Sequence, residues 1–331
     1  MISGAVVLGD GQIRGQAHVV RHRSVGGYRD DGAILCNPLV TGIVGVVGVG
    51  RMGLPVCAAL ARAGIRVVAS DIVAEREPDV LAAGAGWDGD TARLASRAEV
   101  LITVLPGSSE LGEAMSVALP ALAPGATWID LTSAAPATGR ELLARAHARG
   151  IHCLDAPVGG GVEAARHGSL QLFVGGRADV VDRHRALLDA LGRVEHVGDH
   201  GAGYTTKLIV NLLWFGQAVA VGEAMLLARR AGIDLDVLRS ALGASAAASV
   251  FVNRDLETLL DGGYLESFGL DRCHDELEAI VALADELAVP FELSTVVERS
   301  YQAALERYGA VDGELLAVAL LEERAGVRLR R

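Results

Sequence analysis

Short apolar runs alternate with helix-like stretches through the first part of the chain. Runs typical of strands lie at residues 43–47, 65–69, 100–105, 127–131, 151–154 and 170–174. Stretches typical of helices include residues 54–63, 139–149 and 179–191. Because strands alternate with helices, the pattern predicts an α/β fold with a Rossmann-type, doubly wound parallel sheet.

A different pattern begins after Gly203, where no further strand-like run occurs. Residues 204–231 predict one long helix that is apolar on nearly every side, and the chain through about residue 320 is helix-like. Such a helix is buried within a domain or between subunits, so we expect a homodimer or a homotetramer. The expected organisation is an N-terminal extension over 1–42, an α/β domain over 43–202 and an all-helical domain over 203–331, joined by the long helix.

Composition and charge narrow the functional classes. The formal net charge is −11, and phosphate backbones are bound by basic surfaces, so no nucleic-acid partner is expected. The four cysteines are scattered without a C-x-x-C pair, which favours reduced cytosolic thiols and no metal site. No uninterrupted apolar run reaches the roughly 18 residues that span a bilayer, and no signal-peptide pattern is present. We expect a soluble, cytoplasmic protein without a membrane partner, whose Gly- and Arg-rich residues 1–42 are poorly ordered.

A glycine-rich turn follows the first predicted strand and precedes the first predicted helix. Its G-x-G-x-x-G pattern consists of Gly48, Val49, Gly50, Arg51, Met52 and Gly53. In this context Gly48 permits the tight turn, Gly50 lets the backbone approach a diphosphate, and Gly53 lets the helix pack closely on the strand. The pattern predicts a dinucleotide cofactor whose diphosphate lies at the helix N-terminus.

The acid that ends the second strand predicts which dinucleotide is bound. Asp71 can accept hydrogen bonds from the adenosine ribose hydroxyls, and its charge repels a 2′-phosphate. We therefore expect NAD in preference to NADP. Arg76 lies a few residues further on and could still accommodate NADP.

Lys207 stands at the start of the long apolar helix, with Asn211 one turn further along the same face. Partial burial would lower the pKa of this lysine toward a range useful for proton transfer, and Asn211 could orient a substrate hydroxyl or the lysine itself. The alternative from this helix alone is a lysine whose stem lies on apolar surface while its amine reaches solvent.

Four motifs in order resemble the β-hydroxyacid dehydrogenase family, which includes 3-hydroxyisobutyrate dehydrogenase and has an NAD-binding domain of the 6-phosphogluconate dehydrogenase type. The resemblance runs from about Ile43 to Ala288. Its motifs are the glycine turn followed by Leu54-Pro55, the segment Thr103-Val104-Leu105-Pro106, the segment Asp155 to Gly161 with Gly168-Ser169-Leu170 and Gly175-Gly176, and the segment Gly203 to Asn211.

The resemblance implies a role for several residues. It implies that Lys207 is the general acid/base, that Asn211 holds the substrate or the lysine, and that backbone N–H groups of Gly159, Gly160 and Gly161 bind the substrate carboxylate. It also places Leu105, Pro106, Thr132 and Phe268 near the cofactor, with Thr132 near the substrate as well.

Two departures from the family pattern concern the substrate. Gly159 stands where the family usually has Ser, which removes a hydroxyl donor and leaves the backbone N–H. Asp275-Glu276 stands where the family usually has Lys-Asp, which replaces a positive charge by a negative one. Both changes weaken the expectation of an ordinary small carboxylate and leave the hydride chemistry intact.

The sequence thus predicts an NAD(P)-dependent oxidoreductase that transfers hydride between nicotinamide and a small β-hydroxy acid or semialdehyde. Residues 43–202 are expected to form its dinucleotide-binding domain and residues 203–331 its substrate and oligomerisation domain. One alternative is an imine reductase, a related type of enzyme that usually carries Asp or Tyr at the position of Lys207. A second alternative is a nucleotide-binding protein without catalysis, since fold does not dictate function.

Overall fold

The computed structural model describes residues 42–331, and the expectation for the N-terminal extension lies outside the described residues except at residue 42. The first half of the described chain builds one nine-stranded sheet with the strand order β3-β2-β1-β4-β5-β6-β8-β7 and with β9 paired to β8. Its strands are β1 (Ile43–Val47), β2 (Val67–Ser70), β3 (Gly86–Trp87), β4 (Ala98–Thr103), β5 (Thr127–Asp130), β6 (His152–Asp155), β7 (Val158–Gly159), β8 (Leu170–Gly175) and β9 (Gly192–Gly198).

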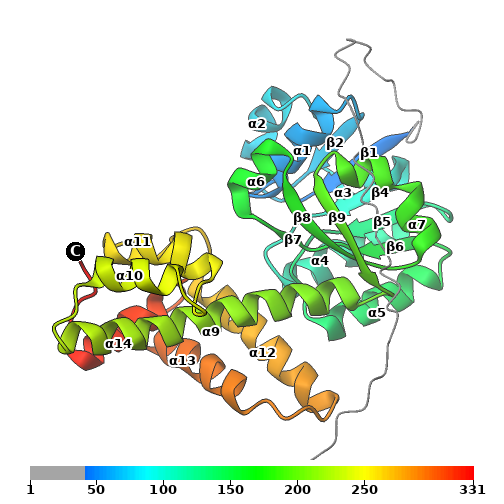
Figure 1. Cartoon of the computed structure of the whole chain (residues 1–331). Helices are drawn as coiled ribbons and strands as arrows, with labels where there is room; N and C mark the ends of the chain where they lie inside the picture. The colour runs from blue at the N-terminus through cyan, green and yellow to red at the C-terminus, as the bar shows by residue number, and fades with distance from the viewer. Residues whose placement is uncertain (1–41) are drawn as a thin grey trace, which may run out of the picture. The chain divides into compact units, whose positions relative to one another are not determined.

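Helices cover both faces of this sheet (Figure 1). Side chains of β1 alternate between the two faces, with Val44 and Val46 in one apolar cluster and Ile43 and Val47 in the other. The first cluster includes residues of α1 (Gly53–Arg62), α2 (Glu77–Ala82), α6 (Gly161–His167), α7 (Ala178–Arg183) and α8 (Arg185–Asp189). The second includes residues of α3 (Thr91–Arg97), α4 (Ser108–Ala121) and α5 (Pro136–His147). This is the doubly wound arrangement that the sequence predicts.

The sheet is not parallel throughout, which corrects one part of the prediction. Strands β1 to β6 are all parallel to their neighbours within this group. In contrast, β8 runs antiparallel to β6 and β7, and β9 is parallel to β8. The chain reverses between β7 and β8, whose connection over residues 160–169 is short, because parallel neighbours need a longer crossover. The two-residue strands β3 and β7 and the partly exposed strand β9 lack the long apolar run that marks the others, and the sequence pattern did not predict them.

The second half is helical, as predicted. The long helix α9 spans Ala202–Arg230, close to the predicted range, and the helices after it are α10 (Leu235–Gly243), a π-helix (Phe251–Asp255), α11 (Leu256–Leu260), α12 (Leu270–Glu286), α13 (Glu292–Tyr308) and α14 (Leu316–Ala325). Two apolar clusters along α9 form the core of this half. The predicted boundary at residues 202–203 lies in the first turn of α9.

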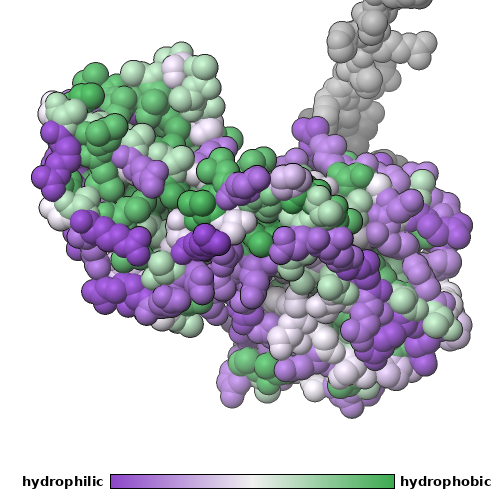
Figure 2. Space-filling model, turned by 90° about the horizontal axis from the view of Figure 1, so that it is seen from below, coloured by the Kyte–Doolittle hydropathy of each residue, from purple (hydrophilic) through white to green (hydrophobic). Residues whose placement is uncertain are grey.

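Helix α9 also corrects the expectation that no segment could span a membrane. On length and composition alone, α9 is long and apolar enough to do so. In the structure its Leu208, Leu212 and Phe215 are buried against the other helices of this half, which is how the core helix of a globular domain packs. Hydrophobic surface is nevertheless concentrated over the helical half (Figure 2).

Candidate active site

The glycine turn has the geometry of a diphosphate cradle. Gly48 has a φ of +91°, and a Cβ on it would lie 2.4 Å from the carbonyl oxygen of Val104. A Cβ on Gly53 would lie 1.9 Å from the carbonyl oxygen of Gly48, so only glycine lets α1 begin this close to the turn. The first turn of α1 contains no acidic residue and no side-chain cap, which leaves its N–H groups able to bind an anion. These features fit the diphosphate of a dinucleotide.

Arg51 in the turn reaches across to the helical half. Its guanidinium donates to the carbonyl oxygens of Glu266 and Ser267 and forms an ion pair of 2.7 Å with Asp312. Phe268, predicted to lie near the cofactor, directly follows Ser267 and packs against the core of the helical half. The structure therefore brings the segment of Phe268 next to the glycine turn.

Asp71 lies beside the turn, at the end of β2. Its carboxylate accepts the N–H of Val49 at 2.7 Å and the N–H of Val73 at 2.9 Å, and it pairs with Arg76 at 2.7 Å. The Asp71 side chain is only 6% exposed, whereas Arg76 is 38% exposed. The guanidinium of Arg76 also lies above Gly50, 3.3 Å from where a Cβ would be. The acid and the base predicted to set cofactor preference thus form one pair at the turn.

Hydrogen bonds join the loop that follows β4 to the loop that follows β5. The N–H of Leu105 donates to the hydroxyl of Thr132 at 3.1 Å, and the N–H of Thr132 donates to the carboxylate of Asp130. Thr132 is buried, while Pro106, next to Leu105, is exposed. The Thr132 hydroxyl therefore fixes the two strand-end loops to each other.

Asp130 is the centre of a buried hydrogen-bond network. Besides Thr132, it accepts the hydroxyls of Thr103 and Tyr204, each at 2.6 Å. Burial raises the pKa of Asp130 to about 6, although these hydrogen bonds act in the opposite direction. Because Tyr204 belongs to the first turn of α9, the network ties that helix to β4 and β5.

Asp155, the last residue of β6, holds the start of α9. Its carboxylate accepts the N–H groups of Gly201 at 3.0 Å, Gly203 at 2.9 Å and Tyr204 at 3.2 Å. A Cβ on Gly203 would lie 2.4 Å from the carbonyl oxygens of Asp155 and Phe173, so the helix start lies directly against the sheet. A carboxylate here satisfies the free N–H groups of the helix N-terminus and favours its dipole.

Lys207 lies one turn further along α9, in a polar group of four residues. Its amine donates to Oδ1 of Asn211 at 3.0 Å, and the amide of Asn211 donates to Glu276 of α12. Glu276 is 7% exposed, and it lies close enough to Ser133, the neighbour of Thr132, for the serine hydroxyl to lower its pKa. The group therefore joins the cofactor-side loop to α9 and α12.

Burial and nearby carboxylates act oppositely on Lys207. Desolvation lowers its pKa, while the charges of Glu276 and Glu314 raise it. Burial in turn raises the pKa of Glu276, and Lys207 with Asn211 and Ser133 opposes that rise. Lys207 is also the only lysine of the chain, and the rest of its 30 Lys and Arg residues are arginines. An amine can lose its proton near neutral pH when its pKa is lowered, and a guanidinium cannot.

The glycine-rich segment predicted to bind a carboxylate lies at the start of α6. Gly160 and Gly161 are exposed with positive φ values of +106° and +70°, and α6 begins at Gly161. Gly159 lies in β7, where an added Cβ would meet only ordinary contacts at 3.7 Å or more. Packing would therefore accept the serine usual in the family, so the glycine is not imposed by the fold.

The structure separates the two acids of the Asp275-Glu276 pair. Glu276 lies in the site, whereas Asp275 is largely exposed and lies 3.7 Å from Arg272, which is also paired to Glu110. Asp275 also belongs, with His274 and Glu278, to the one group of three metal-ligating side chains within 4.8 Å of one another in residues 42–331. Two of these three side chains are exposed, and such exposed groups commonly occur without a metal.

Three residues of the site had no predicted role: Asp130, Asp155 and Tyr204. Asp155 lies 46 to 49 positions from the N–H groups that it accepts, and Asp130 lies 74 positions from Tyr204, so no local pattern indicates these contacts. The sequence alone already singles out Lys207 as a functional candidate, because it is the only lysine of the chain.

Two family models match nearly all of the described chain. Residues 43–201 match the NAD-binding domain of 6-phosphogluconate dehydrogenase, and residues 201–321 match the NAD-binding domain of NADP-dependent 3-hydroxyisobutyrate dehydrogenase. The 3-hydroxyisobutyrate dehydrogenase of Pseudomonas aeruginosa is 34% identical over 63% of this chain and 72% of its own length. The L-threonate dehydrogenase of Cupriavidus necator is 30% identical over 79% of this chain and 90% of its own.

Solved structures agree with this result. A 3-hydroxyisobutyrate dehydrogenase from Salmonella typhimurium superposes with a TM-score of 0.76 at 26% identity, over 84% of this chain and 99% of its own. An imine reductase from Myxococcus stipitatus, with NAD⁺ bound, has a TM-score of 0.57 at 21% identity, over 85% of this chain and all of its own. The similarity to the imine reductase shows a shared fold alone.

Proposed function

Because the chain belongs to the β-hydroxyacid dehydrogenase family of NAD(P)-dependent oxidoreductases, we propose that it oxidises the hydroxyl of a small β-hydroxy acid or reduces the matching semialdehyde. The observation that carries this proposal is Lys207. The only lysine of the chain is half-buried, bonded to Asn211 and connected through Glu276 and Ser133 to the loop of Thr132.

Several residues of the first half would hold the cofactor. The backbone of residues 48–53 would bind the diphosphate, Asp71 the adenosine ribose, and the loops of Leu105-Pro106 and Thr132 would border the nicotinamide, as would Phe268. When bound, the nicotinamide accepts or gives the hydride. We propose NAD as the preferred cofactor, since the buried Asp71 carboxylate disfavours a 2′-phosphate.

The proton is handled by Lys207. In the oxidation direction its neutral amine accepts the proton of the substrate hydroxyl, and in reduction its ammonium donates a proton to the forming hydroxyl. Asn211 fixes the amine in place, so that its other hydrogens or its lone pair can face the substrate. Proton transfer by a placed side chain contributes roughly 10²- to 10⁴-fold to a rate.

The substrate carboxylate would bind to the exposed backbone of Gly160 and Gly161 at the start of α6, with the N–H of Gly159 beside them. The missing serine hydroxyl at Gly159 leaves space for a substrate with a substituent near its carboxylate. Asp275 is negatively charged and lies 3.7 Å from Arg272, so it cannot attract a substrate carboxylate as a lysine would. We therefore infer that carboxylate binding in this protein depends on backbone groups.

We also propose that the protein is a cytoplasmic homodimer or homotetramer. Large apolar side chains are exposed along the helical half, including those of Leu213, Leu227, Leu293 and Val296. Exposed apolar surface of this kind is characteristic of subunit interfaces. The three described cysteines are buried free thiols, which supports a reducing compartment.

The experiment is a turnover assay with both cofactors. Purified protein is mixed with NAD⁺ or NADP⁺ and a panel of β-hydroxy acids, and with reduced cofactor and semialdehydes or a cyclic imine. The proposal expects turnover with a carboxylated substrate that falls about 10²- to 10⁴-fold in Lys207→Ala while the dissociation constant of NADH is unchanged.

The other outcomes point elsewhere. Turnover with the cyclic imine alone would favour an imine reductase and overturn the proposal. NADH binding without turnover across both panels would favour a nucleotide-binding protein without catalysis. Normal turnover in Lys207→Ala would refute the role of the lysine.

A further inference from the structure

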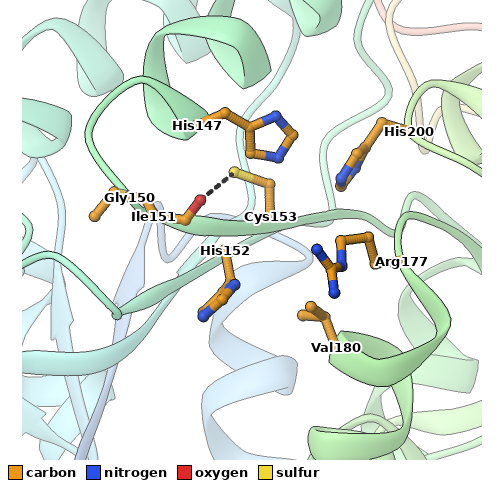
Figure 3. A pocket seen from close by; sticks show the side chains of 8 residues that line it. All are labelled: His147, Gly150, Ile151, His152, Cys153, Arg177, Val180 and His200. Atoms are coloured by element: carbon orange, nitrogen blue, oxygen red, sulfur yellow. Dashed lines mark hydrogen bonds between the residues drawn. The ribbon is translucent and has the colours of Figure 1, made fainter.

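A cavity away from Lys207 collects side chains that can carry positive charge. It has a volume of about 410 Å³ and lies at the start of β6, between α5 and α7. Its lining includes His147, His152, Cys153, Arg177 and His200. Figure 3 shows His147, His200 and Arg177 approaching this space from three different elements.

Two of these side chains have unused hydrogen-bonding capacity, the mostly buried His200 and the 69% exposed Arg177. The Nδ1 atom of His200 is buried without a hydrogen-bond partner among the described residues, since the nearest carboxylate oxygen, on Asp155, lies 3.8 Å away. Arg177 binds Asp179 through Nε and Nη2, and its Nη1 makes none of the hydrogen bonds found between described residues. Buried polar atoms are normally paired, so an unpaired one at a cavity indicates a missing partner.

The charges around the cavity are unbalanced. The rings of His147 and His200 are 4.7 Å apart, and the pKa of His147 is lowered by burial and then by the neighbouring charges of His200, His152 and Arg177. The two acids nearby are already engaged, because Asp155 holds the start of α9 and Asp179 pairs with Arg177. An anion in the cavity would relieve this repulsion.

Two other uses of the cavity fit less well. A metal ion needs several converging ligand atoms, and within residues 42–331 the three histidines do not belong to a group of three or more ligand side chains whose atoms all lie within 4.8 Å of one another. Redox or nucleophilic chemistry needs a thiolate, and burial raises the pKa of Cys153 to about 12, so it remains a thiol.

We propose that this cavity binds a small oxyanion, a carboxylate or a phosphate, between Arg177 and the imidazoles of His147 and His200. Arg177 supplies a permanent charge and a free N–H donor, and His200 supplies the buried Nδ1 position as a donor. An anion favours the protonated form of His147, so binding strengthens as the pH falls.

Calorimetric titration tests this site in the whole protein. Inorganic phosphate and malonate are titrated separately at pH 6 and pH 8 at constant ionic strength, with NAD⁺ present in excess so that the glycine turn is occupied. The variants are Arg177→Gln and His200→Gln. The matched control is Arg193→Gln, since Arg193 is an exposed arginine paired, like Arg177, with an acid two positions further on.

The proposal expects saturable binding of at least one anion, tighter at pH 6 and unchanged in Arg193→Gln. Binding should weaken about tenfold or more in Arg177→Gln and His200→Gln, the factor for one charge-assisted hydrogen bond. Tighter binding of phosphate or of malonate identifies the anion class. Absence of saturable binding, or equal affinity in Arg177→Gln and Arg193→Gln, would overturn the proposed anion site. Circular dichroism confirms that each variant is folded.

Discussion

The amine of Lys207 lies 3.0 Å from Oδ1 of Asn211, and the amide of the same Asn211 donates to Glu276. A neutral amide thus stands between an ammonium and a carboxylate. This arrangement couples their charges without a direct ion pair, which would hold the proton on the lysine more firmly. The amine keeps its remaining hydrogens for a substrate.

Selective modification of Lys207 should abolish turnover. Because Lys207 is the only lysine, an amine-acylating reagent can react only there and at the chain's N-terminus. We expect activity to fall in proportion to acylation of Lys207, measured by peptide mass spectrometry, and NADH with substrate to slow the loss. The same spectra measure acylation of the N-terminus, which should not correlate with the loss of activity. Full activity after complete acylation of Lys207 would contradict the proposed role.

Replacing Glu276 should shift the pH profile. The charge of Glu276 raises the pKa of Lys207, so Glu276→Gln should lower that pKa further. Oxidation needs the neutral amine, and its rate rises with pH through the lysine's pKa. The rising limb of kcat/KM against pH should therefore move to lower pH in Glu276→Gln. A limb that stays in place or moves upward would mean that Glu276 does not act on Lys207 electrostatically.

Asp71→Asn should change cofactor preference. The substitution removes the charge that repels a 2′-phosphate and frees Arg76, now paired with Asp71 at 2.7 Å, to bind one. The ratio of kcat/KM for NADP⁺ to that for NAD⁺ should rise roughly tenfold or more, because a like-charge contact costs over 1.4 kcal/mol. Adding Arg76→Ala should cancel much of this gain. An unchanged ratio in Asp71→Asn would show that another residue sets the preference.

Asp130 should make the stability of the protein depend on pH. Its pKa is raised from an unperturbed 3.8 to about 6 in the folded protein. The folded state therefore holds this proton more tightly, so the contribution is fully present below pH 3.8 and is lost as the pH rises to about 6. The loss amounts to roughly 3 kcal/mol at neutral pH.

Chemical denaturation from pH 4 to pH 8 measures this effect. Asp130→Asn lacks the titration, so the difference in free energy of unfolding between wild type and Asp130→Asn should shift in favour of the variant as the pH rises. Asp199→Asn, an acid whose carboxylate lies outside this network, serves as the control. A difference that does not change with pH would show that Asp130 does not titrate in this range.

The sequence predicts the fold well where a local pattern determines it. The glycine turn, the alternation of strands and helices around it and the length of α9 all follow from neighbouring residues. The direction of β8 was missed, because a strand's apolar pattern is the same in either direction, and only the short connection between β7 and β8 favours the reversal.

The candidate site was predictable only in part. Lys207 and Asn211 share one helix face, so their contact follows from spacing. Glu276 comes from a different helix 65 positions further on, and its contact depends on how α12 packs against α9. The same holds for Asp155, whose role as the cap of α9 depends on β6 ending beside Gly203.

The capping of α9 by Asp155 limits how relatives of this protein can be recombined. Asp155 holds the start of α9 and so sets the distance of Lys207 from the sheet, yet it belongs to the other half of the chain, 52 positions earlier. A chimaera joined anywhere between residues 156 and 201 takes its cap from one parent and its acid/base from the other. Since a misplacement of about 1 Å can cost about 100-fold in rate, such chimaeras should fold and bind cofactor yet differ in turnover according to the fit between the two parents at this single carboxylate.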